Sequence, residues 1–365
     1  MSPKIITVIG SLNTDLVTLT PRVPTGGETL TATSFSTGPG GKGANQAVAC
    51  ARLSRPNPAS APSHTSDVLV KMIGAVGDDE FGPSLISSLE DSLIDTKSIQ
   101  TISKQSTGVA VILVESDSGE NRILLSPGAN HSLKPSAFST PPSLSTPHPS
   151  LLVLQLEIPL PTILQILSTA QASHIPVLLN PAPAVKLPKD AYPSITHIIL
   201  NETEAAILTD REIQSVEAPD FNWRTITTEF LSLGVKTVII TLGAKGAIFA
   251  TGDVYEHVHA EKDVKVVDTT AAGDTFVGAY AVELVRNVNA DAQVMVAAVV
   301  KACKAAARTV EKEGAQSAIP WADETCTNVS RSFACICIST MHCICLVIQS
   351  HPFHVPNLVA INLSV

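Results

Sequence analysis

Aromatic residues and basic charge are both scarce in this chain. Phe, Trp and Tyr make up 4% of the residues, whereas readers of single-stranded nucleic acid stack bases on aromatic side chains. The net charge is −9, and a protein that binds a phosphate backbone needs a basic surface. We therefore expect no nucleic-acid partner. A nucleotide is still allowed, because backbone N–H groups at a helix N-terminus can hold an anion.

Long apolar runs are also missing. None reaches the roughly 18 residues that cross a bilayer. The N-terminus, MSPKIITVIG, has neither the basic start and apolar stretch of a secretory signal nor an Arg- and Ser-rich transit character. The sequence predicts a protein without a membrane partner, located in the cytoplasm and, as a second location, the nucleus.

The seven cysteines fall into two groups. Cys50 and Cys303 lie alone in Ala-rich helical segments, as small buried hydrophobes do. The other five lie in the last 40 residues: Cys326, Cys335, Cys337, Cys343 and Cys345. Their C-x-C pairs flank His342, but zinc sites usually have wider spacing. We interpret residues 325–365 as an atypical C-terminal tail outside the folded core, with a metal-binding module as the alternative.

Apolar runs typical of buried strands alternate with helix-like stretches along the rest of the chain. The strand-like runs cover residues 4–10, 68–76, 151–156, 177–179, 195–200 and 237–242. The helix-like stretches cover residues 44–53, 80–93, 161–173, 202–208, 223–233, 273–286 and 291–313. This alternation predicts an α/β fold, a doubly wound and mainly parallel sheet flanked by helices.

Two pairs of segments do not follow this alternation of strands and helices. Residues 14–36 and 107–128 alternate polar and apolar side chains, which predicts half-exposed antiparallel strands in a small β-sheet that acts as a lid. The stretches 55–66 and 133–150 are rich in Pro and Ser. We expect both to be mobile surface loops that contribute nothing to the core.

A glycine-dense segment, GPGGKGAN, covers residues 38–45. It satisfies G-x-G-x-x-G, but no buried strand precedes it and no acidic residue follows at the required distance. It is not a Walker A loop either, because Gly43 follows Lys42 where Ser or Thr is needed. What remains is a hinge from which Lys42 and Asn45 can reach a hydroxyl-rich ligand. A tight turn without a ligand is the alternative.

Polar residues follow two of the predicted strands. Asn13 and Asp15 in GSLNTD come directly after the first strand, and Glu157 closes the strand LLVLQLE. Ligands of open α/β sheets bind at the carboxyl ends of the strands. These side chains match the vicinal hydroxyls of a sugar, although an ordinary Asx turn would also explain Asn13 and Asp15.

The segment VVDTTAAGDTFVGAYAVEL, residues 266–284, passes from a strand end into an amphipathic helix. Ala271, Ala272 and Gly273 leave backbone N–H groups uncovered, which makes an anion site. Asp274 follows in the first turn, where it can accept the proton of an attacking hydroxyl. Phosphoryl transfer to an alcohol needs little more than such a base and such donors. The alternative role for Asp274 is to cap the helix or to complement its dipole.

Two further segments can complete a nucleotide site. NETEA (201–205) ends a strand and begins a helix, and TLGAKGA (241–247) is a glycine-bounded turn after another strand. Each is a weak signal alone.

These segments together resemble the ribokinase family of carbohydrate kinases. The resemblance runs from about residue 5 to residue 321 and rests on GSLNTD, PTGGET, GPGGKGANQAVA, LQLE, LNPAPA, NETEA, TLGAKGA, VDTTAAGDTF and GAQSAIP, in that order. It implies a kinase domain over residues 1–324, a lid through which two copies form a homodimer, and transfer of the γ-phosphoryl group of ATP to the 5-hydroxyl of D-ribose.

The resemblance also implies roles for individual residues. The sugar would contact Asn13, Asp15, Gly41, Lys42, Asn45 and Glu157, with Asp274 as base and Ala271, Ala272 and Gly273 in the anion hole. The nucleotide would contact Asn201, Glu204, Thr241, Leu242, Gly243, Ala244, Lys245, Gly246, Gly273 and Cys303. Mg²⁺ would accompany ATP, oriented through Glu204 and water. A monovalent cation, K⁺ in most relatives, would lie near Asp268, Thr270, Thr309, Lys312, Gly314 and Ala318. Cys303 departs from the family, which often has Asn or His there.

Two other functions stay open. One is a kinase of the same superfamily that acts on another sugar or on a nucleoside. The other is a non-catalytic sensor of a sugar or nucleotide, which would be free to lose Asp274.

Overall fold

The computed structural model describes residues 3–117, 120–287 and 291–325. The predictions for the Cys-rich tail, including the metal-binding alternative, concern residues 326–365 and lie outside the described residues. In the described ranges, no helix is both long and apolar enough to cross a membrane.

A nine-stranded sheet forms the centre of the fold, in the order β13-β12-β11-β10-β9-β8-β1-β4-β5. Its strands are β1 (Lys4–Ile9), β4 (Val68–Gly77), β5 (Asp95–Ile102), β8 (Leu151–Leu154), β9 (Val177–Leu179), β10 (His197–Asn201), β11 (Thr237–Thr241), β12 (Ala247–Ala250) and β13 (Tyr255–Val258). All neighbours from β11 to β5 pair in parallel, and the last two strands pair antiparallel. The predicted doubly wound, mainly parallel sheet is confirmed.

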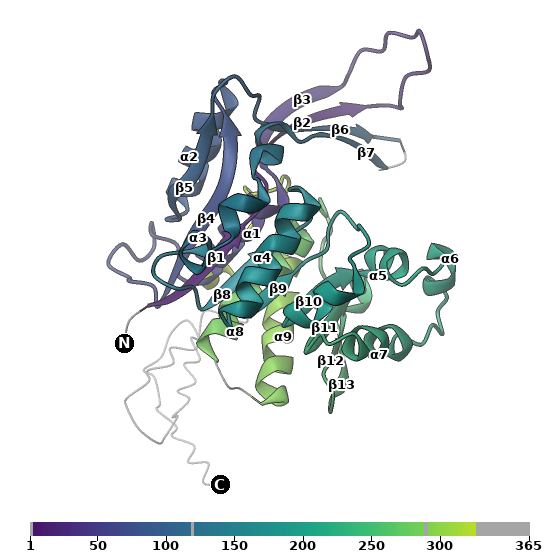
Figure 1. Ribbon diagram of the computed structural model, residues 1–365. Coiled ribbons are helices and arrows are strands. Elements are labelled where there is room, and N and C mark those ends of the chain that lie inside the picture. The colour runs from purple at the N-terminus through teal and green to yellow at the C-terminus, as the bar shows by residue number, and fades with distance from the viewer. Residues whose placement is uncertain (1–2, 118–119, 288–290, 326–365) are drawn as a thin grey trace, which may run out of the picture. The chain divides into compact units, whose positions relative to one another are not determined.

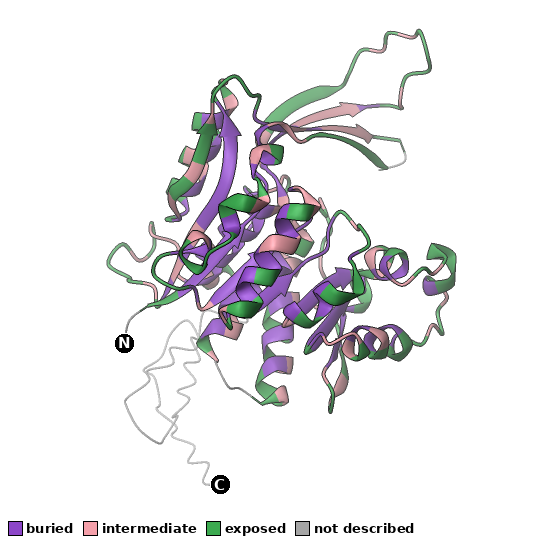
Figure 2. Cartoon of the chain, viewed as in Figure 1, coloured by how far each residue is buried: buried purple, intermediate pink, exposed green. Residues whose placement is uncertain are grey.

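Helices cover both faces of this sheet (Figure 1). They are α1 (Lys42–Leu53), α2 (Phe81–Asp91), α3 (Pro141–Leu144), α4 (Leu160–Ala172), α5 (Glu202–Leu208), α6 (Ile213–Val216), α7 (Arg224–Ser232), α8 (Ala272–Arg286) and α9 (Ala292–Thr309). Alternate residues of β8 join opposite cores: Leu151 and Val153 pack with α1, α8 and α9, while Leu152 and Leu154 pack with α4 and α7. Figure 2 shows the central strands buried on both sides, which explains their nearly continuous apolar sequence.

The close packing of α1 on α8 depends on small residues. A Cβ added at Gly278 would come within 2.3 Å of the Ala49 Cβ. This contact brings the N-termini of the two helices together at one edge of the sheet.

The prediction that residues 133–150 contribute nothing to the core is wrong. Leu133, Phe138 and Leu144 are buried in the same core as α4. Prolines begin the short helices η2 (Pro135–Phe138) and α3, and these turns direct the apolar side chains inward. Thr162 and Thr169 of α4 donate side-chain hydrogen bonds to carbonyl oxygens of this segment. The proline content therefore marks helix starts rather than an unstructured loop.

A second sheet of four strands has the order β3-β2-β6-β7 (Figure 1). Its strands are β2 (Asn13–Thr20), β3 (Ser34–Gly40), β6 (Gly108–Glu115) and β7 (Asn121–Ser126). The predicted small sheet is present, but β2 and β6 pair in parallel, so it is not wholly antiparallel. Because β2 begins four residues after β1 ends, the second sheet starts at the carboxyl edge of the main one.

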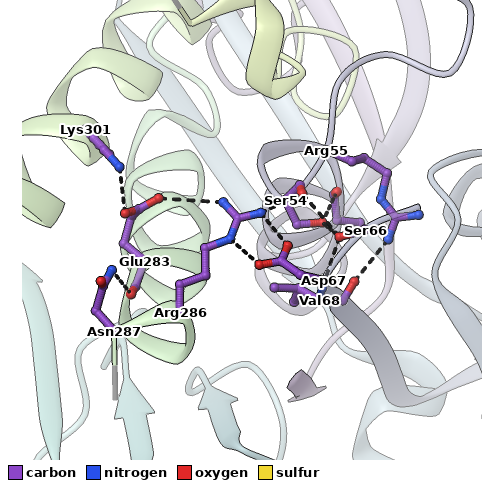
Figure 3. A network of polar contacts seen from close by, with 10 residues as sticks. Ser54, Arg55, Ser66, Asp67, Val68, Glu283, Arg286, Asn287 and Lys301 are labelled. Atoms are coloured by element: carbon purple, nitrogen blue, oxygen red, sulfur yellow. Dashed lines mark hydrogen bonds and ion pairs between the residues drawn. The ribbon is translucent and has the colours of Figure 1, made fainter. Parts of the chain in front are cut away.

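A polar network ties the stretch around residues 54–68 to α8 (Figure 3). Arg286 donates to both carboxylate oxygens of Asp67 and to the carbonyl of Ser54. Glu283 joins α8 to α9 through Lys301, at 2.8 Å. These pairs are partly exposed, so their contribution to stability is small.

Candidate active site

The candidate site lies where the carboxyl ends of β1, β8, β10 and β11 meet the N-termini of α1 and α8. This is the edge at which open parallel sheets bind ligands. The segments that the sequence singled out for the sugar converge here, although they are spread over more than 200 residues of the chain.

Glu157 connects three of these segments. Its Oε2 accepts hydrogen bonds from Ser11 Oγ at 2.5 Å, from the Lys42 backbone N–H at 3.0 Å and from Asn13 Nδ2 at 3.4 Å. Asn13 is held in turn by Asn130, whose Nδ2 donates to Asn13 Oδ1 at 2.8 Å. The sequence did not indicate Ser11 or Asn130. Asn13, Lys42 and Glu157 are brought together as predicted.

The glycine hinge before α1 is needed for close backbone approach. A Cβ at Gly40 would lie 2.2 Å from Asp15 Oδ2, and one at Gly41 would lie 2.7 Å from the Asn13 backbone nitrogen. Gly41 also has φ of 87°, a conformation that other residues rarely adopt. The hinge therefore makes room for Asn13 and Asp15 beside α1.

Asp15 is a carboxyl group in an unfavourable environment for charge. Burial, together with the negative charges of Glu157 and Asp274, raises the pKa of Asp15 to about 7. A carboxyl group with this pKa is partly protonated near neutral pH, so it can donate a hydrogen bond as well as accept one.

Asp274 lies in the first turn of α8, buried with 6% of its surface exposed. Its Oδ2 accepts from Asn45 Nδ2 at 3.0 Å, and its Oδ1 accepts from Gln46 Nε2 at 2.9 Å. The residue before α8 is Ala271, in the left-handed conformation, and α8 has no side-chain cap. Asp274 therefore does not cap α8, because its carboxylate accepts hydrogen bonds from α1, whereas its place in the first turn agrees with the role of a dipole complement.

Gly273 leaves free space beside Asp274, and Asn45 has a side-chain oxygen that can accept a hydrogen bond there. A Cβ at Gly273 would meet nothing within 4 Å, so a ligand can approach this backbone closely. Asn45 Oδ1 is buried and has no hydrogen-bond partner in the described part of the chain. A buried acceptor of this kind is costly unless a donor reaches it.

Lys42 carries the positive charge of the site. Burial lowers the pKa of its ammonium group, but the negative charges of Asp274, Glu157 and Glu204 outweigh burial, and the net shift is upward. Lys42 thus stays charged and links the sugar residues electrostatically to Glu204.

Asn201 and Glu204 form a capping box at the start of α5. The Glu204 backbone N–H donates to Asn201 Oδ1 at 2.8 Å, and the Asn201 N–H donates to Glu204 Oε2 at 2.9 Å. Burial raises the pKa of Glu204, against the opposing effects of the Asn201 N–H and Lys42.

The predicted nucleotide loop, residues 241–246, follows β11 as a short 3-10 turn. Gly243 and Gly246 have φ of 54° and 99°, and a Cβ at Gly246 would lie 2.0 Å from the Val258 carbonyl oxygen. Lys245 Nζ lies 3.4 Å from Glu202 Oε1, which brings this loop beside the start of α5.

Hydrogen bonds connect three of the residues expected near a monovalent cation. Asp268 Oδ1 accepts from the Thr270 N–H and hydroxyl at 2.8 and 2.6 Å, and Oδ2 accepts from the Gly314 N–H at 2.9 Å. The other three make separate contacts: Thr309 Oγ1 donates to Thr275 Oγ1, Lys312 pairs with Glu324, and Ala318 is fully buried.

No cluster of three or more His, Cys, Asp or Glu residues that could hold a metal occurs among the described residues. Cys303, expected near the nucleotide, packs from α9 against the core of α1 and α8. Burial, and next the charge of Glu261, raise the pKa of its thiol to about 11.

Comparisons with known proteins identify a family. Residues 4–322 match the model of the pfkB family of carbohydrate kinases. The chain is 42% identical over 323 residues to a ribokinase of Schizosaccharomyces pombe, which covers 86% of this chain and 94% of the relative. It is 37% identical over 316 residues to a deoxyribokinase of Salmonella typhi, with coverage of 86% and 95%.

Solved structures give the same result. A ribokinase of Thermotoga maritima is 32% identical with a TM-score of 0.72, over 88% of this chain and 98% of that one. An Arabidopsis thaliana ribokinase complexed with ribose and ATP is 25% identical with a TM-score of 0.72, over 89% and 98%.

Proposed function

Since this chain belongs to the pfkB family of carbohydrate kinases, we propose that it transfers the γ-phosphoryl group of ATP to the 5-hydroxyl of D-ribose, giving ribose 5-phosphate and ADP. One observation carries the proposal. A buried carboxylate, Asp274, lies beside the unobstructed backbone of Gly273 at the start of α8 and faces the polar residues of α1. The relatives named ribokinase add support for ribose.

The polar residues around Asp274 suit a sugar. Asn45 Oδ1 is a buried acceptor, and a sugar hydroxyl would supply the donor that it needs. Glu157 offers carboxylate oxygens as acceptors and Asn13 offers an amide NH₂ group as a donor. Asp15 can both donate and accept a hydrogen bond. We assign the sugar to these residues together with Gly41 and Lys42.

The chemistry follows from the same groups. Asp274 accepts the proton of the 5-hydroxyl while that oxygen forms a bond to the γ-phosphorus. The bond between this phosphorus and the β–γ bridging oxygen breaks, and ADP leaves with the electron pair. Backbone N–H groups of residues 271–274 donate to the transferring phosphoryl group, at the positive end of the α8 dipole, and the Ala272 N–H shares its hydrogen with the Thr269 carbonyl oxygen, 3.3 Å away.

The nucleotide is assigned to Asn201, Glu204, Gly273, Cys303 and residues 241–246. Mg²⁺ would neutralise charge on the phosphates. It would be bound mainly by the ATP phosphates, and the described residues include no cluster of three or more His, Cys, Asp or Glu side chains that could hold it. Glu204 would orient it through water. We assign a K⁺ site to the segment of Asp268, Thr270 and Gly314, where backbone carbonyls must contribute because three hydrogen bonds already reach the Asp268 carboxylate.

The second sheet is proposed as a lid within a kinase domain of residues 1–324, and as a dimer surface. Phe35 and Leu124 are exposed on one face of this sheet, by 62% and 68%, and Ile123 and Leu125 are exposed on the other, by 57% and 40%. Exposed apolar side chains of this kind mark interaction surfaces, and a second copy of the sheet would cover the face that carries Phe35 and Leu124. Sedimentation should show a dimer for the native chain and a monomer for Leu124→Glu; a native monomer would refute this part. The location in the cytoplasm and nucleus stays a prediction of the sequence.

An ADP-release assay tests the proposed reaction. Ribose, 2-deoxyribose, fructose and adenosine are compared with and without K⁺. We expect the highest kcat/KM for ribose and an increase with K⁺. The deoxyribokinase relative makes 2-deoxyribose the main competitor. A higher kcat/KM for any competitor would refute the ribose assignment, and ribose binding without ADP release would indicate a sensor.

A further inference from the structure

Gln46 is a buried glutamine of α1 to which the proposed reaction assigns no role. Its side chain has no exposed surface. Its Nε2 lies 2.9 Å from Asp274 Oδ1 and 3.0 Å from Asn180 Oδ1, and its Oε1 accepts from Gln155 Nε2 at 2.6 Å. The catalytic carboxylate is thus the end of a buried chain of three amides.

The carboxylate determines the direction of the Gln46 amide and, through it, that of the Gln155 amide. An ionised carboxylate only accepts hydrogen bonds, so the Gln46 NH₂ group must face Asp274 and its oxygen must face Gln155. Asn180 is fixed separately, because its Nδ2 donates to the Ile199 carbonyl at 2.9 Å. Rotation of the Gln46 amide would place its oxygen against the carboxylate, so the arrangement has one favourable state.

Gln46 and Asn45 are neighbours in sequence but differ in their relation to the site. Asn45 donates to Asp274 Oδ2 and keeps a buried Oδ1 without a partner, as a ligand contact would. Gln46 uses both ends of its amide on protein groups. Oδ1 of Asp274 is therefore held by the protein, and Oδ2 is the oxygen beside the residue expected to contact the sugar.

We propose, on the basis of the proposed kinase reaction, that Gln46 is a positioning residue for Asp274, held in place by Gln155 and Asn180. It fixes the plane of the carboxylate so that Oδ2 faces the acceptor hydroxyl. Hydrogen bonds to a charged acceptor are about twice as strong as neutral ones, and low dielectric strengthens them further. Small errors in the placement of a reacting group cost much of the rate.

The test replaces Gln46 by Met, which keeps the length of the side chain and removes the amide. We expect kcat to fall roughly 10- to 100-fold, the usual scale for loss of a hydrogen bond to a charged group. The Kd values for ribose and ATP should change by less than about 3-fold, because Gln46 contacts neither. Gln165→Met is the matched control, since the Gln165 amide donates to Thr169 within α4. It should leave kcat and both Kd values unchanged.

A second variant tests the chain itself. Gln155→Met should lower kcat by about 3- to 10-fold, and the double variant should be no slower than Gln46→Met, because Gln155 acts through Gln46. If Gln46→Met does not fold, the kcat of Gln155→Met decides alone.

The outcomes separate this inference from the proposed reaction. A native protein that releases no ADP with any sugar refutes the reaction. An active native protein with an unchanged kcat in Gln46→Met, or in Gln155→Met where that variant decides, overturns the positioning role alone. The positioning role is also overturned if the affinity for the sugar falls by the same factor as kcat in Gln46→Met. It is likewise overturned if the effects of Gln46→Met and Gln155→Met on kcat are additive in the double variant.

Discussion

The raised pKa of Asp15 predicts an unusual dependence of stability on pH. In the unfolded chain this carboxyl group ionises with its ordinary pKa of 3.8, and in the folded protein with a pKa of about 7, because of burial and the charges of Glu157 and Asp274. Between these values the folded state binds one more proton than the unfolded state. Stability contributed by Asp15 therefore decreases as pH rises through this window.

The magnitude follows from the size of the shift. A difference of about three pKa units corresponds to roughly 4 kcal/mol, as an upper limit, at about 1.4 kcal/mol per unit. The variant Asp15→Asn has nearly the same shape and cannot ionise. Relative to the native protein, its free energy of unfolding should rise from pH 4 to pH 7 by up to this amount and then level off.

Urea denaturation at half-unit steps from pH 4 to pH 8.5 measures both proteins, and the difference between them removes the titration of groups that do not interact with Asp15. Two parallel curves would refute the reasoning, because Asp15 would then ionise alike in both states. A difference of the opposite sign would show that Asp15 is stabilised as a carboxylate. The same variant should bind ribose at least about 10-fold more weakly, since a sugar contact is changed.

Three further substitutions test other parts of the structure. Asp274→Ala should lower kcat by roughly 10²- to 10⁴-fold, the usual effect of a general base, with the Kd of ribose changed less than about 10-fold; retained turnover in the ADP-release assay would exclude this base. Gly40→Ala places a Cβ 2.2 Å from the Asp15 carboxylate and should raise the KM for ribose by about 10-fold or more, whereas an unchanged KM would place the sugar elsewhere. Arg286→Ala removes the partly exposed pair with Asp67 and should lower the free energy of unfolding by about 1 kcal/mol or less in urea, with kcat unchanged; a larger loss would mean that the network of Figure 3 is structurally essential.

The central strands could be predicted because both of their faces are buried. In β1 and β8 nearly every residue is apolar, a pattern that few other elements produce. The edge strand β5, with the sequence DTKSIQTI, was missed, since half-exposed polar residues give no such signal. Residues 133–150 were misassigned for the opposite reason, because proline content outweighed three well-spaced apolar residues.

The grouping of Asn13, Lys42, Glu157 and Asp274 was predictable from one rule, that the carboxyl ends of parallel strands meet at one edge. Their supporting partners were not. Gln46 lies 228 residues from Asp274 and 134 from Asn180, and no local pattern relates them. A signal did exist: Gln46 and Gln155 are polar residues inside stretches that are otherwise fully buried. Such residues require partners, although the sequence does not say which.

The sequence predicted Asp274 as the base and Asp15 as a sugar contact, but it could not predict how the surroundings of these two aspartates differ. Two amide N–H groups point at Asp274, the arrangement that suits a carboxylate that only accepts. Asp15 lies against Gly40 with two carboxylates nearby, and its pKa of about 7 leaves it partly protonated. Like charges in a buried site disfavour ionisation of a neighbouring carboxyl group, and Asp15 is the group whose pKa they raise. Lys42 belongs to this balance, because its charge is maintained against burial by the carboxylates around it. These environments support the roles assigned in the proposed reaction, in which Asp274 receives a proton and Asp15 hydrogen-bonds sugar hydroxyls in either direction.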